Sequence, residues 1–387
     1  MSMTRRDFVR WTGIGATAAA AAGIAPASAG TGRTEQQAAS GGLSPEERGI
    51  HPILERDHPY IFIDSCMQMW PDAPFADAHR YGATVYGVTA WDPHLDVDRA
   101  LEGLMFWHAV VRKHPTLAIV AKAAEIPGLK KSGRAGLLLA SQCGDFIGDK
   151  LHRLEAFYRL GLRMLILAYS QSNRLCGGCL DKADGGLTSL GELVVDECNR
   201  LGLLLDGSHI GARSALEMIE RSRQPVVFSH SGADAVAPNP RNVDDARIKA
   251  CAAKGGVVGL CPWGPMVLKK GRTTRPTVDD FIDHIDHAAQ IVGGVDHLGV
   301  GTDMSLGTYP EHVADPWGAP ALKDVAGAYD KHITANFRSP LRMVEGFSQY
   351  AEVVHFADRL GTRGYSDSDI RKILGENFLR VFGQVWK

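Results

Sequence analysis

The chain of 387 residues lacks a marked excess of charge of either sign, because 42 Lys and Arg stand against 44 Asp and Glu. A chain this close to neutrality has no overall attraction for nucleic acid or an anionic membrane surface, so we expect no nucleic-acid partner. After residue 29 the chain also lacks an apolar run of the roughly 20 residues that a membrane span needs. We therefore expect no transmembrane span in the mature protein.

The first 29 residues have the features of an export signal rather than of a folded segment. The pair Arg5-Arg6 resembles the twin-arginine export motif, a weakly apolar stretch rich in Ala and Gly follows, and Ala27–Ala29 offers a cleavage site of small residues. Residues 30–48 are polar and rich in Gly and Ser, which predicts a flexible leader. We expect a periplasmic or secreted protein. Because the twin-arginine route carries folded proteins, a metal or cofactor loaded in the cytoplasm is favoured.

The cysteines are odd in number, seven, so they cannot all pair with one another. An export compartment permits disulfides, and Cys176 and Cys179 form a CxxC pair that is a candidate for one. The same pair is typical of redox sites and of half a metal site, but no second CxxC supports a zinc ribbon.

From Tyr60 onward, short apolar segments alternate with longer helical patterns, of which Ala100–His114, Leu117–Ala124, Leu187–Leu201 and Ile282–Val292 are examples. Continuous apolar runs are typical of buried parallel strands. Eight βα units in series predict an α/β fold, a closed (β/α)8 TIM barrel over residues 49–387. An open doubly wound sheet is the alternative, but no glycine-rich GxGxxG turn follows the first strand. The predicted strands are 60–63, 84–88, 135–139, 164–168, 203–206, 225–229, 256–260 and 297–301.

Polar residues follow these strands, where such a barrel carries its chemistry. His209 and His230 come after the fifth and sixth strands, and Asp303 after the eighth. Two imidazoles and a carboxylate are a common catalytic zinc set. Asp303 is either a ligand or a base that takes a proton from water, unless it only caps a turn.

Seven short motifs stand out along the chain: Gly186–Gly191, Leu205–His209, Pro225–Ser231, Arg241–Val243, Lys254–Gly259, Val295–Gly301 and Gly375–Arg380. In their order and spacing they resemble the membrane (renal) dipeptidase family. The resemblance runs from about Tyr60 to the C-terminus. It implies an amidohydrolase-type barrel with a two-zinc centre that hydrolyses dipeptides, and a possible homodimer.

By position, the resemblance implies that His209 and His230 are ligands of one zinc and that Asp303 lies near the metal and its water. It also implies that Arg241 holds the carboxylate of the substrate. A guanidinium fork suits a terminal carboxylate because it can form two parallel hydrogen bonds.

The chain departs from the family at four positions. Cys66 and Gln68 replace a His-x-Asp pair, Gln142 replaces the Glu that bridges two zinc ions, and Tyr169 replaces a catalytic His. A neutral amide cannot supply an anionic bridge between two dications. We therefore predict one ion per chain, zinc in the first instance, with copper or another divalent metal as alternatives. Cys66, Gln68 and Gln142 remain possible ligands.

The sequence thus predicts a metal-dependent hydrolase that cleaves a dipeptide, or a related small amide or lactone, from a substrate with a carboxylate. Tyr169 either donates a hydrogen bond to the developing oxyanion or only lines the pocket. Other readings stay open at this point. Cys66 with Cys143 forms a softer metal site or a disulfide, or Cys66 is a nucleophile. The barrel supports a lyase or isomerase reaction, or it is an inactive binding protein.

Overall fold

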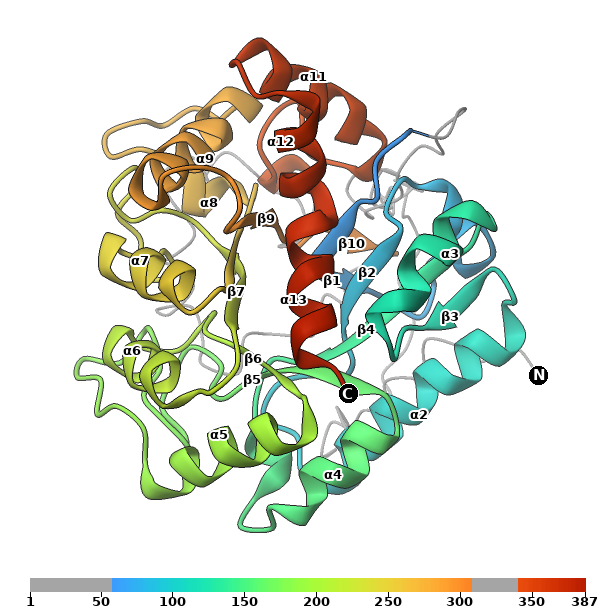
Figure 1. Ribbon diagram of the computed structural model, residues 1–387, viewed down its shortest axis with the longest axis vertical. Helices are drawn as coiled ribbons and strands as arrows, with labels where there is room; N and C mark the ends of the chain where they lie inside the picture. The colour runs from blue at the N-terminus through green and yellow to red at the C-terminus, as the bar shows by residue number, and fades with distance from the viewer. Residues whose placement is uncertain (1–57, 308–339) are drawn as a thin grey trace, which may run out of the picture.

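The computed structural model of the chain describes residues 58–307 and 340–387, and within them the predicted strands run parallel in one curved sheet (Figure 1). The predicted signal peptide, 1–29, and leader, 30–48, lie outside the described residues. The strands are β1 (Ile63–Met69), β2 (Val85–Thr89), β3 (Leu117–Ile119), β4 (Ala135–Ser141), β5 (Leu162–Ile166), β6 (Leu204–Asp206), β7 (Val226–Ser231), β8 (Val257–Leu260), β9 (Leu298–Val300) and β10 (Ser305–Leu306).

The sheet closes through the single segment that contains β9 and β10. β9 pairs with β8, while β10 pairs with β1. Between them the backbone N–H of Asp303 donates to the Cys66 carbonyl over 2.8 Å, and the backbone N–H of Gln68 donates to the Met304 carbonyl over 2.8 Å. The ring is therefore complete, and the predicted α/β fold, a (β/α)8 barrel, is confirmed.

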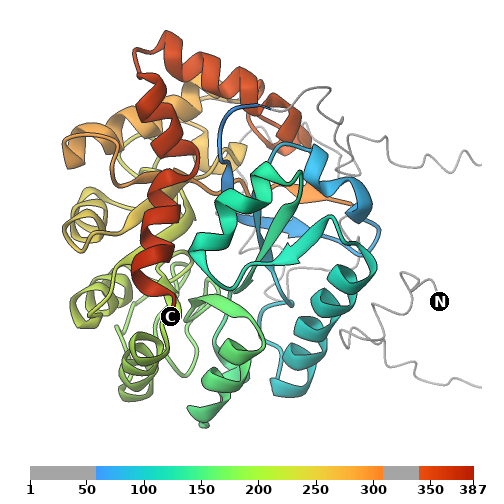
Figure 2. The ribbon, with the colours of Figure 1, turned by 45° about the vertical axis from the view of Figure 1, so that its right-hand side comes forward.

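Helices surround the strands on the outside (Figures 1 and 2). Three predicted helices are present with changes at their ends: α2 at 97–113, α5 at 189–201 and α9 at 278–292. Thr188 caps α5 by accepting from the Gly191 backbone amide. The helices are α2 (Val97–Lys113), α3 (Ile126–Lys131), α4 (His152–Arg159), α5 (Ser189–Leu201), α6 (Ala212–Arg221), α7 (Asp245–Ala253), α8 (Gly264–Val267), α9 (Val278–Val292), α11 (Val353–Thr362), α12 (Asp367–Arg371) and α13 (Asn377–Val385).

Two of the predicted elements are wrong in detail. The segment 117–124 is not a helix, because Leu117–Ile119 pairs with β4 as a short strand and tertiary pairing overrides the helical pattern. The first strand begins at Ile63 and continues to Met69, so Cys66 and Gln68 lie within it rather than after it. The apolar pattern in the sequence stops before the strand does. The later residues of β1 include polar side chains, which remain in the strand because they form hydrogen bonds inside the barrel.

Helix α13 covers the end of the barrel at which the strands begin, and it crosses the centre of Figure 1. The Asn377 amide group donates to the carbonyls of Val295 and Leu298, next to the start of β9. Phe378 and Phe382 pack against residues that point into the barrel from several strands. The opposite end, where the strands finish, is left for the site.

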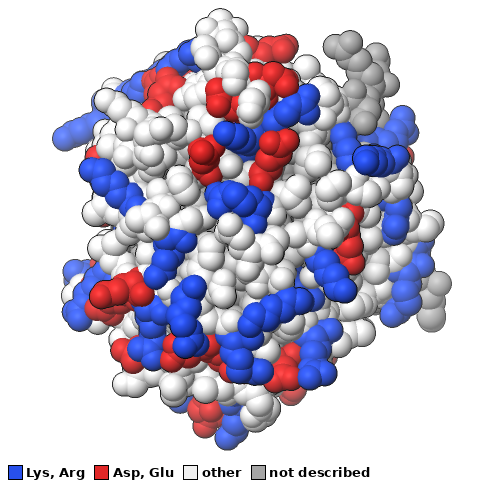
Figure 3. All heavy atoms as spheres, in the orientation of Figure 1, with Lys and Arg blue, Asp and Glu red and all other residues white. Residues whose placement is uncertain are grey.

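The surface agrees with the near-zero net charge. Figure 3 shows Lys and Arg interspersed with Asp and Glu on the face seen in Figure 1. Among the described residues, no helix combines the length and the apolar character that crossing a bilayer would require.

His284 of α9 joins the outer helices to the loop after β7. Its Nδ1 accepts the backbone N–H of Ala233 over 2.8 Å, and the side chain is fully buried. Burial lowers the pKa of His284 to about 4, so folding favours the neutral ring. This contribution is complete above the unfolded pKa of about 6.5 and is lost as the pH falls toward 4.

We expect the variant His284→Asn, which keeps an acceptor near Nδ1 but does not titrate, to lose less stability in acid than the wild type. Between pH 6.5 and 4 the wild type should lose about 3 kcal/mol more than the variant. Urea unfolding at pH 7.5, 6, 5 and 4 measures the difference. If the free energies of unfolding of the two proteins fell in parallel with pH, His284 would not be a buried neutral imidazole in the folded protein.

Candidate functional site

Four of the predicted site residues meet at the end of the barrel where the strands finish. The Nε2 atoms of His209 and His230 are 2.9 Å apart. Cys66, His230 and Asp303 each offer one ligand atom, and these three atoms all lie within 4.8 Å of one another. All four side chains are buried. The structure therefore gathers two nitrogens, a sulfur and a carboxylate oxygen around one small volume.

Each of the two imidazoles forms a hydrogen bond with a serine hydroxyl on the side of the ring away from the centre. Ser170 Oγ lies 2.8 Å from His209 Nδ1, and Ser229 Oγ lies 2.7 Å from His230 Nδ1. The Nδ1 atoms are thus engaged away from the centre, and the Nε2 atoms face it. Such outer partners fix the ring orientation and the tautomer of metal-binding histidines.

A buried carboxylate, Asp64, supports the Cys66 and Asp303 side of the centre. Its Oδ1 accepts from the amides of Thr302, over 2.8 Å, and Cys66, over 3.2 Å. Its Oδ2 accepts from the hydroxyls of Thr302, over 2.5 Å, and Tyr350, over 2.6 Å. Burial raises the pKa of Asp64 to about 7, although these hydrogen bonds oppose the rise.

A second buried carboxylate, Asp206, supports the histidine side. Its Oδ1 accepts from the amides of Ser208 and Ser229, each over 2.9 Å, and so ties the end of β6 to β7. Ser208 and Ser229 directly precede His209 and His230. Neither Asp206 nor Asp64 is among the site residues predicted from the sequence. Their one signal is an acidic residue inside or at the end of an apolar strand, just before a candidate ligand.

Two amide side chains, those of Gln142 and Gln68, border the centre. Gln142 Nε2 donates to Cys66 Sγ over 3.1 Å and to Thr89 Oγ1 over 2.9 Å. Gln68 Nε2 donates to Thr89 Oγ1 and Asp303 Oδ1, each over 3.3 Å. Both amides direct N–H groups toward their neighbours. Burial, with the charge of Asp303 second, raises the pKa of the Cys66 thiol.

Arg241 and Tyr169 lie beside the histidines. Arg241 is buried, and its Nη2 donates to the His230 carbonyl over 3.3 Å. The Tyr169 ring stacks on the His209 ring with centroids 4.1 Å apart. Tyr169 also meets His94 edge to face at 6.0 Å, so its ring lies against two histidines.

Backbone strain is concentrated around this centre. In the described parts of the chain, the non-glycine residues with left-handed φ are His94 at 67°, Ser170 at 63°, His209 at 66° and Asp303 at 54°. Such a conformation costs on the order of 1 kcal/mol or more and persists where the surroundings impose it, often at functional sites. His209 and Asp303 offer ligand atoms, and Ser170 holds His209.

The cysteines carry no disulfide in this structure. All seven lie in the described residues and all are free thiols, including Cys176 and Cys179. The hypothesis of a disulfide between Cys66 and Cys143 is wrong. Cys66 Sγ accepts from Gln142, whereas Cys143 Sγ lies 3.8 Å from His94 Nδ1.

Comparison with known proteins identifies the family. Residues 72–325 match the membrane dipeptidase family, peptidase family M19. The chain belongs to this family. Two curated dipeptidases are similar to it: Dipeptidase tcpJ of Claviceps purpurea is 29% identical over 268 residues, which are 68% of this chain and 54% of that protein. Dipeptidase 3 of Rattus norvegicus is 27% identical over 292 residues, 74% of this chain and 52% of that protein.

The alignment thus spans about half the length of these two dipeptidases. A solved amidohydrolase from Pseudomonas aeruginosa has the same fold as this dipeptidase-family chain. Its TM-score is 0.72 at 27% identity, and the match covers 84% of this chain and 97% of that one. The resemblance to the membrane dipeptidases that the motifs indicated is confirmed.

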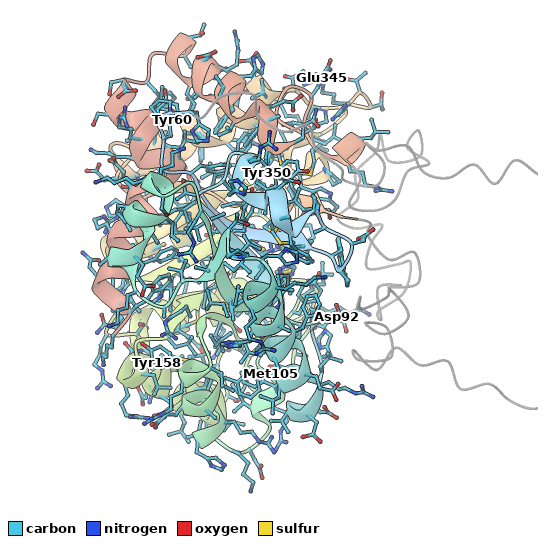
Figure 4. All side chains as sticks on the ribbon, turned by 90° about the vertical axis from the view of Figure 1, so that its right-hand side faces the viewer. Tyr60, Asp92, Met105, Tyr158, Glu345 and Tyr350 are labelled. Atoms are coloured by element: carbon cyan, nitrogen blue, oxygen red, sulfur yellow. The ribbon has the colours of Figure 1, made fainter. Side chains whose placement is uncertain are left out.

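The buried hydroxyl of Tyr350, labelled in Figure 4, tests the support given by Asp64. Tyr350→Phe removes a hydrogen bond to a carboxylate, so we expect a loss of about 1.5–3 kcal/mol in the free energy of unfolding. Tyr86 is a matched control: it is equally buried and meets the Tyr350 ring edge to face with centroids 5.2 Å apart, but its hydroxyl donates to the neutral Ala78 carbonyl. Tyr86→Phe should cost about 1 kcal/mol.

Urea unfolding at pH 8 compares the two variants. Equal losses, or a larger loss in Tyr86→Phe, would show that the Asp64 carboxylate does not anchor the segment before α11.

Proposed function

We propose that this member of the membrane dipeptidase family is an exported, metal-dependent hydrolase that cleaves a dipeptide, or a related small amide or lactone, at a single divalent ion. The observation that carries the proposal is the convergence of His209, His230, Cys66 and Asp303 on one volume. The twin-arginine motif at Arg5-Arg6 supports export.

The donor set fits one ion. Two imidazole nitrogens, a thiolate sulfur and a carboxylate oxygen are ligands that suit zinc, a borderline-soft dication. Both imidazoles turn Nε2 toward the centre because serines hold their Nδ1 atoms. Asp303 completes the set from the segment that closes the barrel.

The donor set does not fit a second ion beside the first. Gln68 and Gln142 stand where the resemblance implies an Asp and a bridging Glu. Their amide groups donate N–H to Thr89, Asp303 and Cys66. A neutral amide that presents N–H groups neither bridges nor neutralises two dications. These contacts favour a mononuclear centre in this chain.

A bound divalent ion would supply Lewis-acid activation of water and of the scissile carbonyl. The side chains supply the remaining roles. The Asp303 carboxylate accepts a proton from the attacking water and returns it to the leaving amine. Two hydrogen bonds fix its orientation. The Gln68 side-chain amide donates to the carboxylate, and the Asp303 backbone N–H donates to the Cys66 carbonyl.

In this proposal Arg241 and Tyr169 bind the substrate. Arg241 is anchored by its Nη2 hydrogen bond to the His230 carbonyl, which leaves guanidinium N–H groups for a carboxylate next to the histidines. The Tyr169 ring is fixed by stacking on His209, and its hydroxyl is the candidate donor to the oxyanion that develops on the carbonyl. A dipeptide offers both groups, a free carboxylate and an amide carbonyl close to it.

The first test is the metal content of protein exported by its native route and purified without added metal. We expect His230→Ala to hold one divalent ion fewer per chain than the wild type, because it removes a central donor. Dipeptide hydrolysis should fall by about a hundredfold or more, since the lost activation is worth roughly 3 kcal/mol. Elemental mass spectrometry and a dipeptide and lactone panel provide the two measurements.

His297→Gln is the matched control, since His297 bonds to the Gly256 carbonyl at the opposite end of the barrel. It should keep the metal and the activity of the wild type. Equal metal content in wild type and His230→Ala, or hydrolysis that survives in His230→Ala, would refute the proposed centre.

A second test concerns the carboxylate. Arg241→Lys replaces a fork of N–H donors by a point charge, so KM for a dipeptide should rise about tenfold or more while kcat changes less. For the same dipeptide with its C-terminus amidated, wild type and variant should have similar KM values. Arg380→Lys, a change at the α13 end of the barrel, is the control. An equal rise in KM for both substrates would show that Arg241 does not bind the substrate carboxylate.

A further inference from the structure

A second group of metal-ligating side chains lies at the same end of the barrel but outside the centre described above. His94 follows β2, and Cys143 and Asp145 follow β4. Each offers one ligand atom, and the three atoms lie within 4.8 Å of one another. The resemblance to the dipeptidases assigns no role to any of the three residues.

The distances within the group fit a shared ion. His94 Nδ1 lies 2.9 Å from Asp145 Oδ2 and 3.8 Å from Cys143 Sγ. Zinc binds nitrogen and oxygen at about 2.0–2.2 Å and sulfur at about 2.3 Å, which places tetrahedral ligand atoms roughly 3.3–3.6 Å apart. Small movements of the side chains would therefore let all three donors reach one ion.

Asn173 holds two of the donors in place. Its Nδ2 donates to Asp145 Oδ1 over 2.8 Å and to the Leu167 carbonyl over 2.8 Å, and it lies 3.6 Å from Cys143 Sγ. Its Oδ1 accepts from the Leu175 amide over 2.8 Å, which fixes the orientation of the side-chain amide. An outer amide that donates to a carboxylate and a sulfur is typical support for metal ligands.

Strain links this group to the first centre. His94 has a φ of 67°, and the other non-glycine residues with left-handed φ in the described chain, Ser170, His209 and Asp303, all belong to the first centre. The surrounding structure thus keeps His94 in this backbone conformation despite its free-energy cost, at a place where the imidazole meets a thiol and a carboxylate.

We propose that His94, Cys143 and Asp145 bind a second divalent cation of the zinc class, separate from the ion proposed at His209 and His230. The site takes one nitrogen, one sulfur and one oxygen, and the Cys143 thiol releases its proton to water as the ion binds. The side chains of His94 and Asp145 are 20% and 27% exposed, so an ion and a further ligand can enter from solvent. Tyr169 lies between the two centres because its ring contacts both His94 and His209.

Cobalt(II) binding to the full chain tests the proposal, because each centre contains one cysteine. Thiolate bound to cobalt(II) gives a charge-transfer band in the near ultraviolet. Equilibrium dialysis of metal-free protein followed by elemental analysis gives the number of ions bound. We expect two ions in the wild type and one in Cys143→Ser, which should also lose part of the band. Cys66→Ser should keep the band that comes from Cys143.

His94→Asn is a second variant, chosen because Asn tolerates the left-handed φ of this position. It should also lose about one ion of the two. Cys198→Ser is the control, since Cys198 is a buried thiol in α5 outside both groups, and it should bind as the wild type. Circular dichroism confirms that each variant is folded.

The outcomes separate this inference from the proposed function. If Cys143→Ser and His94→Asn bind as many ions as the wild type with the full band, the second site is refuted. If Cys66→Ser abolishes the whole band, only the first centre binds cobalt through sulfur, and the second site is again refuted. If the wild type binds one ion that Cys143→Ser loses and His230→Ala keeps, the second site stands and the proposed catalytic centre fails.

Discussion

The closure of the barrel depends on one buried carboxylate. Asp64 of the first strand receives hydrogen bonds from Thr302 and Tyr350, which are 238 and 286 residues away along the chain. Without these donors a carboxylate in this place would lose its hydration with no compensation. With them, β1 is joined to the turn after β9, and Cys66 and Asp303, the neighbours of Asp64 and Thr302, are brought together. Asp206 does the same between β6 and β7, so the two halves of the site rest on two buried acids.

The chain keeps the barrel of the membrane dipeptidases, and amides lie in its candidate site at two positions where the resemblance implies carboxylates. The histidines from β6 and β7 and the acid after β9 remain, but Gln142 and Gln68 contribute amides where carboxylates are expected. These amides are hydrogen-bonded through Thr89 into a small network with Cys66 and Asp303. The two amides thus share one hydrogen-bond network, which agrees with the single-ion centre proposed above.

The architecture could be predicted from the sequence because eight apolar segments recur in series and each becomes a buried strand. The ends of the elements were less predictable. β1 continues past its apolar start because Asp64 finds partners in segments far along the chain, and no local pattern shows this. His209, His230 and Asp303 could be identified from their places at or just beyond the ends of apolar strands, although His230 lies within the last residues of β7. Asp64, Asp206 and His94 could not, because their importance depends on Tyr350, Ser229 and Asp145, which only the folded chain brings near.

Helix α13 has a consequence for the order in which the protein is made. Phe378 and Phe382 seal the end of the barrel at which every strand begins, and they pack against residues of β1, β2, β4 and the following strands. While residues 377–385 are still inside the ribosome, the apolar interior of the ring is open at that end. The growing chain therefore leaves that end of the ring open until α13, which follows every strand in the sequence, has emerged. The core that these strands share with Phe378 and Phe382 is therefore completed only after the last strand has been made.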